Sequence, residues 1–142
     1  MPTRTATAVW TGGFKNGNGR FTGTSGLNGS YTAASRFEND PGLNPEDLLA
    51  AAEASCYSMA LSAALDKNGT PPTTVETTAR CTVEKVNGAN TITTMEIDTR
   101  ADVPNIDDAT FQTIAAATRD GCPVSRALKG NVDIRLTATL GR

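Results

Sequence analysis

Residues 44–69, with the sequence NPEDLLAAAEASCYSMALSAALDKNG, contain the clearest helix in the chain. Asn44 is a good N-cap, Pro45 suits the first helical position, and Gly69 is a natural stop. The residues between them are apolar or small on nearly every side, which is typical of a buried helix. We therefore predict a helix over residues 45–67, about 35 Å long at 1.5 Å per residue. One 142-residue subunit would struggle to cover it, so the pattern favours a second subunit.

The segments on either side of this helix alternate with the period of β-strands. Turn signals at Gly12-Gly13 and Asn16-Gly17-Asn18-Gly19 divide the first third of the chain into short strands, and Gly88 turns a later antiparallel hairpin. The predicted strands are residues 3–10, 19–25, 29–35, 74–86, 90–103 and 131–140. Two further helices are expected, at residues 108–120 and from Pro123 to about Leu128. The order βββ-α-ββ-αα-β predicts an α+β fold.

The charge of the chain is nearly balanced, with 13 Lys and Arg against 15 Asp and Glu and a net charge of -2. Nucleic-acid binding and contact with a membrane through a polybasic segment therefore lack an electrostatic basis. We expect no signal peptide and no segment of membrane-spanning length. The expected location is the cytoplasm, where structural disulfides are rare and cysteines need another explanation.

The chain has three cysteines and no histidine. Ser-His-Asp and Cys-His catalysis within one chain are therefore excluded. The cysteines are dispersed and lack the paired spacing of zinc ligands, and we expect neither a metal nor an organic cofactor. An enzyme built on this chain would have to use thiols, carboxylates or arginines.

Each cysteine also has a purely structural interpretation. Cys56 lies in the middle of the predicted buried helix and could be a small core residue. Cys122, between Gly121 and Pro123, could merely connect two helices, although a helix start also stabilises a thiolate. Cys81 lies on the apolar face of a predicted strand, where core packing is the favoured interpretation.

A peroxide-reducing cysteine offers a chemical interpretation that links several residues. Such a cysteine must be a thiolate, which burial disfavours, so a nearby cation is required. Without histidine the best candidate is arginine, whose planar fork can hold a peroxide oxygen or a carboxylate. Arg36, just past a predicted strand, could serve, with Glu46 fixing its fork. Taken alone, Arg36 is a surface cation, and Glu46 is an acid in the first turn of a helix, where the helix dipole stabilises a negative charge.

Four segments, in this order and spacing, resemble one known family. The segments are Ser35–Glu38, Asn44–Ala52, Ala54–Leu61 and Gly121–Ser125. The chain resembles the osmotically inducible protein C family, which includes the organic hydroperoxide resistance proteins, and it is closer to the osmotically inducible branch. The resemblance covers essentially the whole chain, as one domain of residues 1–142. It implies an intertwined homodimer with long central helices wrapped by antiparallel sheets.

The resemblance also implies a function and a set of site residues. It makes Cys56 the peroxidatic cysteine, which reduces organic hydroperoxides to alcohols. It makes Cys122 the resolving cysteine, which forms an intrasubunit disulfide with Cys56. Glu46 matches the acid of the family and Arg36 its thiolate-activating arginine, with Arg20 as a rival from the other branch. The implied reductant is a dithiol, such as a lipoyl-bearing protein.

Two alternatives stay open at this point: a thiol redox sensor, and a noncatalytic stress-response dimer that binds a ligand. Local electrostatics alone would make Cys122 the easier thiolate, so the peroxidase interpretation requires Arg36 to stabilise Cys56. Glu46 and Cys56 are ten residues apart, roughly 15 Å along one helix. Glu46 would therefore act through a long arginine or come from a partner subunit, which places the predicted site at a dimer interface.

Overall fold

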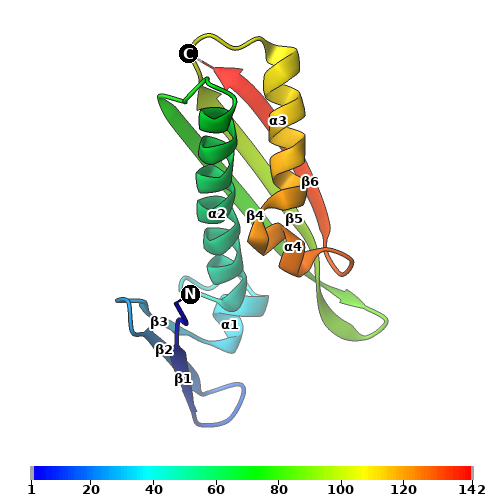
Figure 1. The fold of residues 1–142 in the computed structure, drawn as a ribbon. Coiled ribbons are helices and arrows are strands. Elements are labelled where there is room, and N and C mark those ends of the chain that lie inside the picture. The colour runs from blue at the N-terminus through cyan, green and yellow to red at the C-terminus, as the bar shows by residue number, and fades with distance from the viewer. Residues whose placement is uncertain (1, 142) are drawn as a thin grey trace. The chain divides into compact units, whose positions relative to one another are not determined.

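The computed structural model describes residues 2–141, and the chain divides into two compact units. One unit ends at Leu48 and the other begins at Leu49. Each unit has its own three-stranded sheet. The boundary falls near the start of helix α2 (Pro45–Lys67), whose bounds are those predicted (Figure 1). The expectation of a single domain over residues 1–142 stays a prediction.

The N-terminal unit contains the three short strands that the turn signals predicted, and they form an antiparallel sheet in the order β1-β2-β3. The strands are β1 (Ala6–Thr11), β2 (Asn18–Gly23) and β3 (Asn28–Tyr31). The predicted strand over residues 29–35 was wrong at its end, because helix α1 (Ala33–Phe37) begins there. Thr32 and Ser35 form a capping box in which each side chain accepts a hydrogen bond from the other's backbone N–H, at 3.0 and 2.9 Å.

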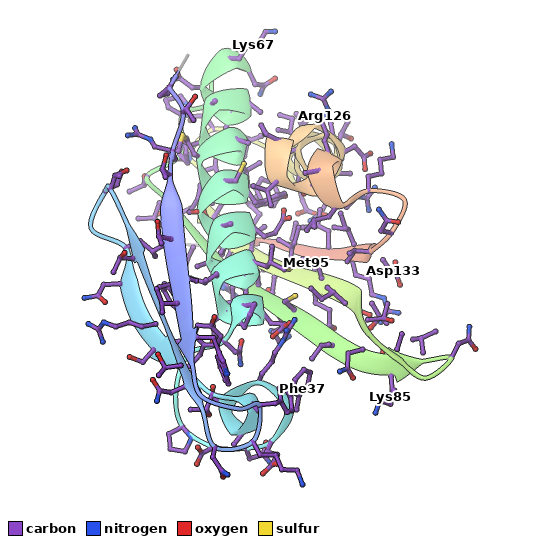
Figure 2. All side chains as sticks on the ribbon, turned by 90° about the horizontal axis from the view of Figure 1, so that it is seen from below. Phe37, Lys67, Lys85, Met95, Arg126 and Asp133 are labelled. Carbon is purple, nitrogen blue, oxygen red and sulfur yellow. The ribbon has the colours of Figure 1, made fainter. Side chains whose placement is uncertain are left out.

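The C-terminal unit follows the predicted order of elements closely. Its elements are β4 (Thr74–Val86), β5 (Ala89–Asp102), α3 (Asp108–Gly121), α4 (Pro123–Leu128) and β6 (Asp133–Gly141). The β4–β5 turn has positive φ at Asn87 (51°) and Gly88 (81°), the conformation that suits a two-residue hairpin loop. Near Lys85 this hairpin extends beyond the helices (Figure 2).

The expectation that only antiparallel sheets are present was wrong for β6. The β4–β5 hairpin is antiparallel, but β6 pairs with β5 in parallel, from Thr94↔Asp133 to Asp102↔Gly141. The cause is the connection between them, because helices α3 and α4 carry the chain back to the end at which β5 began. Parallel neighbours require such a crossover, whereas a tight turn gives antiparallel ones.

Helices α2 and α3 lie over the same face of the β4-β5-β6 sheet (Figure 1). Together these elements enclose the hydrophobic core of the C-terminal unit. Helix α2 contributes a buried ridge at every fourth residue, with Tyr57, Leu61 and Leu65 all at 0% exposure. The sheet and α3 supply the rest of the buried cluster, which is Met95, Ile97, Ala101, Val103, Phe111 and Ala115.

The opposite face of α2 is exposed, so this chain alone buries the helix on one side only. The exposed stripe, with a spacing of four residues, is Ala51, Ser55, Met59 and Ala63.

By length and composition α2 could also cross a membrane, so the expectation that no segment has spanning length was wrong. The core helix of a soluble protein meets the same criterion.

Candidate active site

The sulfur atoms of Cys56 and Cys122 lie 2.9 Å apart. Both cysteines are free; Cys56 is half-buried, and Cys122 has 0% exposure. Since an S–S bond is roughly 2.05 Å long, the two sulfurs would have to approach by only about 0.9 Å to form one. The structure thus brings together the two cysteines that the family resemblance paired.

The junction of α3 and α4 positions Cys122. Its backbone N–H donates to the Thr118 carbonyl (2.8 Å) in the last turn of α3, and its carbonyl accepts from the N–H of Arg126 (2.9 Å) in α4. Pro123 occupies the first turn of α4, where its missing N–H costs nothing. The Cys122 side chain makes no capping hydrogen bond. Its sulfur is therefore available to the side chains of α2.

Burial raises the pKa of the Cys56 thiol, and the neighbouring Cys122 raises it further. A hydrogen bond from the backbone of Val124 acts in the opposite direction and lowers this pKa. Val124 lies in the first turn of α4, so the Cys56 thiolate gains help from the start of that helix although Cys56 itself lies in the middle of α2. Because the net direction is upward, a further cation is needed to keep Cys56 ionised at neutral pH.

Arg36 and Glu46 form an ion pair within the N-terminal unit. The Arg36 Nε donates to both carboxylate oxygens of Glu46 (3.1 and 3.3 Å), and its Nη2 donates to Oε1 (2.8 Å). The Arg36 guanidinium also lies over the Phe37 ring, 5.2 Å from its centroid. Glu46 thus holds the fork of Arg36 as the sequence predicted. The action of this pair on Cys56 stays a prediction.

The rival arginine, Arg20, is exposed on β2 and contacts neutral side chains of β3. Its Nη1 donates to Ser30 Oγ at 3.3 Å, and its Nη2 donates to Asn28 Oδ1 at 3.2 Å. These are cross-strand contacts that help to align β2 with β3. A guanidinium that a carboxylate holds in a fixed orientation is better preorganised than one that contacts only neutral groups. This difference favours Arg36 over Arg20 as the candidate for the activating arginine.

A cavity of about 410 Å³ lies beside Arg36 within the N-terminal unit. Its walls are largely aromatic, and its lining includes the rings of Trp10, Phe14, Tyr31 and Phe37. The Trp10 and Tyr31 rings contact each other at 5.7 Å between centroids, as do those of Phe14 and Phe37 at 6.5 Å. Such walls suit an apolar group better than a small polar molecule.

The third cysteine occupies a packing position. Cys81 is half-buried on β4, opposite Met95 of β5, and lies against the core cluster of the C-terminal unit. Its position agrees with the interpretation as a core residue. Within residues 2–141, no group of three or more Cys, Asp or Glu side chains is arranged to hold a metal ion.

The sequence analysis missed Glu53 as a functional candidate. It has 0% exposure and continues the buried ridge of α2, four residues before Tyr57. Its Oε1 accepts hydrogen bonds from Ser125 Oγ (2.5 Å) and from Cys122 Sγ (3.8 Å). The available signal was its spacing, because an acid on a ridge of large apolar residues must be buried wherever that ridge packs.

Tyr57 joins α2 to α3 through a buried hydrogen bond from its hydroxyl to the Ala115 carbonyl, at 2.9 Å. Burial also raises the pKa of its phenol. We expect Tyr57→Phe to lower the free energy of unfolding by about 1 kcal/mol, because the carbonyl loses a donor while the ring still fills its place. Urea denaturation should show a lower midpoint with an unchanged slope. An unchanged midpoint would mean that this bond contributes nothing net.

Comparisons with known proteins agree with this arrangement. Residues 37–137 match the family model described as OsmC-like protein. The chain is 40% identical over 129 residues to Peroxiredoxin OsmC of Escherichia coli strain K12, covering 89% of this chain and 90% of that one. It is 35% identical over 98 residues to an organic hydroperoxide resistance protein of Xanthomonas axonopodis pv. citri, covering 68% and 66%. The crystal structure of an organic hydroperoxide resistance protein from Elizabethkingia anophelis has a TM-score of 0.76 at 25% identity and covers 99% of each chain.

Proposed function

Because the chain belongs to the OsmC-like protein family, we propose that it is a cysteine-based peroxidase that reduces organic hydroperoxides to alcohols. The observation that carries the proposal is the 2.9 Å separation of the sulfurs of Cys56 and Cys122, which are 66 residues apart in the sequence. Relatives named as a peroxiredoxin and as hydroperoxide resistance proteins support the same reaction class.

The proposed cycle has three steps. The Cys56 thiolate attacks the peroxide O–O bond, becomes a sulfenic acid and releases the alcohol. Cys122 then condenses with the sulfenic acid, which forms an intrasubunit disulfide and releases water. A dithiol, such as that of a lipoyl-bearing protein, restores both thiols by exchange. We also propose a cytoplasmic location, because this cycle suits a reducing compartment.

In this proposal Arg36 stabilises the Cys56 thiolate and holds the peroxide, while Glu46 fixes its guanidinium. The three hydrogen bonds between them support this role, since they hold the fork in one orientation. The aromatic cavity beside Arg36 supports an organic substrate, because it can take the apolar part of a hydroperoxide.

The direct test is stopped-flow measurement of cumene hydroperoxide consumption by the reduced protein, with hydrogen peroxide as the comparison substrate. We expect rapid consumption of the organic peroxide, slower reaction with hydrogen peroxide, and loss of two thiols per subunit. Turnover should continue when a dithiol is supplied. Oxidation of the thiols without turnover would favour the redox sensor, and no reaction with either peroxide would favour the noncatalytic dimer.

We further propose that the protein is a homodimer whose subunits meet along α2. The exposed stripe of this helix supports the proposal, since Met59 at its centre is 72% exposed in the single chain. The N-terminal unit also exposes many large apolar side chains, more than a soluble monomer usually leaves in water. The exposed residues of that unit are Val9, Trp10, Phe14, Leu27, Phe37 and Leu43.

Met59→Glu is expected to dissociate this dimer, because it would place a charge at the centre of an apolar contact. Light scattering after size exclusion should show the mass of two chains for the wild type and of one for the variant. Asn68→Glu, which adds the same charge at an exposed position just beyond α2, is the control and should remain dimeric. A monomeric wild type with full activity would contradict both the dimer and a site shared between subunits.

A further inference from the structure

Glu53 is an unusual residue for its position. The buried ridge of α2 continues from it through Tyr57, Leu61 and Leu65, and all four side chains have 0% exposure. An apolar side chain would fit this ridge without the desolvation cost of a carboxyl group. Within residues 2–141, Glu53 Oε2 is the one buried side-chain oxygen or nitrogen without a hydrogen-bond partner. Such a costly placement points to a chemical role.

The neighbours of Glu53 are the two reacting cysteines. Glu53 and Cys56 lie three residues apart on α2, and Cys122 and Ser125 lie three residues apart at the start of α4. Residues at this spacing share one face of a helix, so the two faces bring the four side chains together. Glu53 Oε1 accepts from Ser125 Oγ at 2.5 Å and from Cys122 Sγ at 3.8 Å.

The single proton on the Cys122 thiol therefore has two acceptors within reach, Cys56 Sγ at 2.9 Å and Glu53 Oε1 at 3.8 Å. When Cys56 is a sulfenic acid, Cys122 must direct a sulfur lone pair at Cys56 and must lose its proton elsewhere. Glu53 Oε1 contacts this sulfur and can accept the proton.

We propose that Glu53 is the general base that deprotonates Cys122 during disulfide formation. The inference rests on the proposed peroxidase function and assigns it a further catalytic residue. The proton passes from Cys122 to Glu53, and the Cys122 sulfur forms a bond with the Cys56 sulfur. The S–O bond of the sulfenic acid breaks, and the departing hydroxide takes up a proton from solvent to leave as water, while Glu53 returns its proton to solvent. No other oxidant or reductant is consumed.

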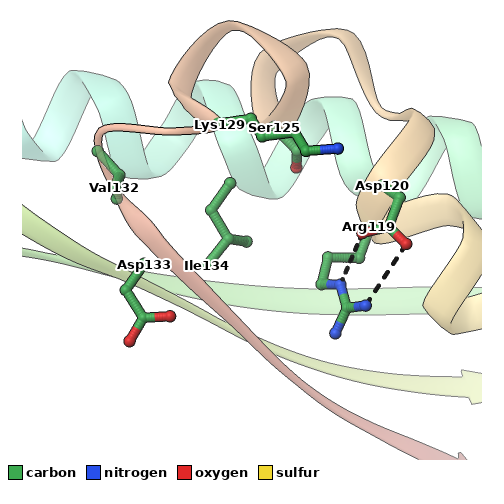
Figure 3. A pocket seen from close by; sticks show the side chains of 7 residues that line it. All are labelled: Arg119, Asp120, Ser125, Lys129, Val132, Asp133 and Ile134. Carbon is green, nitrogen blue, oxygen red and sulfur yellow. Dashed lines mark hydrogen bonds and ion pairs between the residues drawn. The ribbon is translucent and has the colours of Figure 1, made fainter.

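Ser125 connects Glu53 to a route for the proton. Its side chain lines a cavity of about 290 Å³ at the surface, together with the ion pair of Arg119 and Asp120 and with Lys129 (Figure 3). Its hydroxyl donates to Glu53 Oε1, so proton exchange through this hydroxyl links the buried carboxyl group to the solvent side. Ser125 thus positions the base and reaches the cavity.

The test is a comparison of the two oxidative steps in Glu53→Gln and in the wild type. Rapid quenching, alkylation and mass spectrometry would follow the sulfenic acid and the disulfide after one equivalent of cumene hydroperoxide. We expect disulfide formation to slow by about 10²-fold, the usual contribution of a general base. The sulfenic acid should accumulate, and excess peroxide should convert it to sulfinic acid.

The first step provides the internal control. The Glu53 charge raises the pKa of Cys56, so its removal should leave peroxide attack unchanged or faster. A variant that merely disturbed the packing would slow both steps. Glu76→Gln, on the exposed edge of β4, is the matched substitution and should change neither step.

If Glu53→Gln does not fold, the wild type still tests the inference. Its disulfide formation should be slower in D₂O than in H₂O, whereas its peroxide attack should not. Disulfide formation at the wild-type rate in folded Glu53→Gln, or without a solvent isotope effect, would overturn the role of Glu53 and leave the peroxidase intact. A wild type that consumes no peroxide would overturn both proposals.

Discussion

Cys56→Ser is expected to abolish the consumption of cumene hydroperoxide, with a loss of about 10⁴-fold or more. The hydroxyl of serine is not ionised at neutral pH and cannot replace a thiolate as the attacking group. The substitution removes one sulfur atom from a half-buried position, so the fold should persist. Stopped-flow assays and a thermal melt of the same preparation would measure the two effects separately.

Cys122→Ser is the informative companion to this variant. It should consume one equivalent of peroxide at the wild-type rate and then stop, because the Cys56 sulfenic acid has no resolving thiol. Further peroxide should convert Cys56 to sulfinic acid. If Cys56→Ser kept the activity while Cys122→Ser lost it, the assignment of the two cysteines would be reversed. Such a reversal is the outcome that the local position of Cys122 at a helix start would favour on its own.

Most element bounds could be predicted because local signals define them. Helix α2 begins and ends where Pro45 and Gly69 predicted, and the Asn87-Gly88 turn sets the β4–β5 hairpin. Helix α1 was missed because its signal is short: Thr32 and Ser35 cap a helix of five residues after a strand-like alternation. The parallel pairing of β6 was missed as well, since strand direction depends on a crossover of some thirty residues rather than on the pattern of the strand.

The candidate site could be predicted as far as its residues lie in the segments that resemble the family. The sequence motifs paired Cys56 with Cys122 and Arg36 with Glu46, and each pair is in contact. The spacing of Glu53 pointed to its burial, but its hydrogen bonds with Ser125 and Cys122 could not be predicted, because they arise only when α4 packs against α2. The same holds for the hydrogen bond from Val124 to Cys56. Contacts between elements far apart in the sequence carry no local signal. The proposed role of Glu53 therefore rests on contacts that only the structure shows.

Arg36→Ala should give the second largest effect, a fall of up to about 10³-fold in the rate of peroxide attack at pH 7. Burial and Cys122 already raise the pKa of Cys56. In the proposed site Arg36 is the cation that offsets these effects, so its loss should raise the pKa of Cys56 further, by about 1–3 pH units. The thiolate is the basic form, so a higher pKa leaves less of it at pH 7, and the rate should recover as the pH rises. The measurement is the pH profile of the stopped-flow rate.

Arg20→Ala is the matched control, because it removes the rival arginine of the N-terminal unit together with its contacts with Ser30 and Asn28. It should leave both the rate and the pH midpoint close to the wild type. Arg36→Lys separates the two roles of the guanidinium. The charge of the lysine should return the midpoint of the pH profile most of the way to the wild-type value. The rate at high pH should stay low, because lysine lacks the planar fork. If the midpoint of the pH profile in Arg36→Ala stayed as low as in the wild type, Arg36 would be excluded as the activating cation. A raised midpoint in Arg20→Ala instead would transfer that role to Arg20, and the ion pair with Glu46 would then be only a structural contact of α1 with the start of α2.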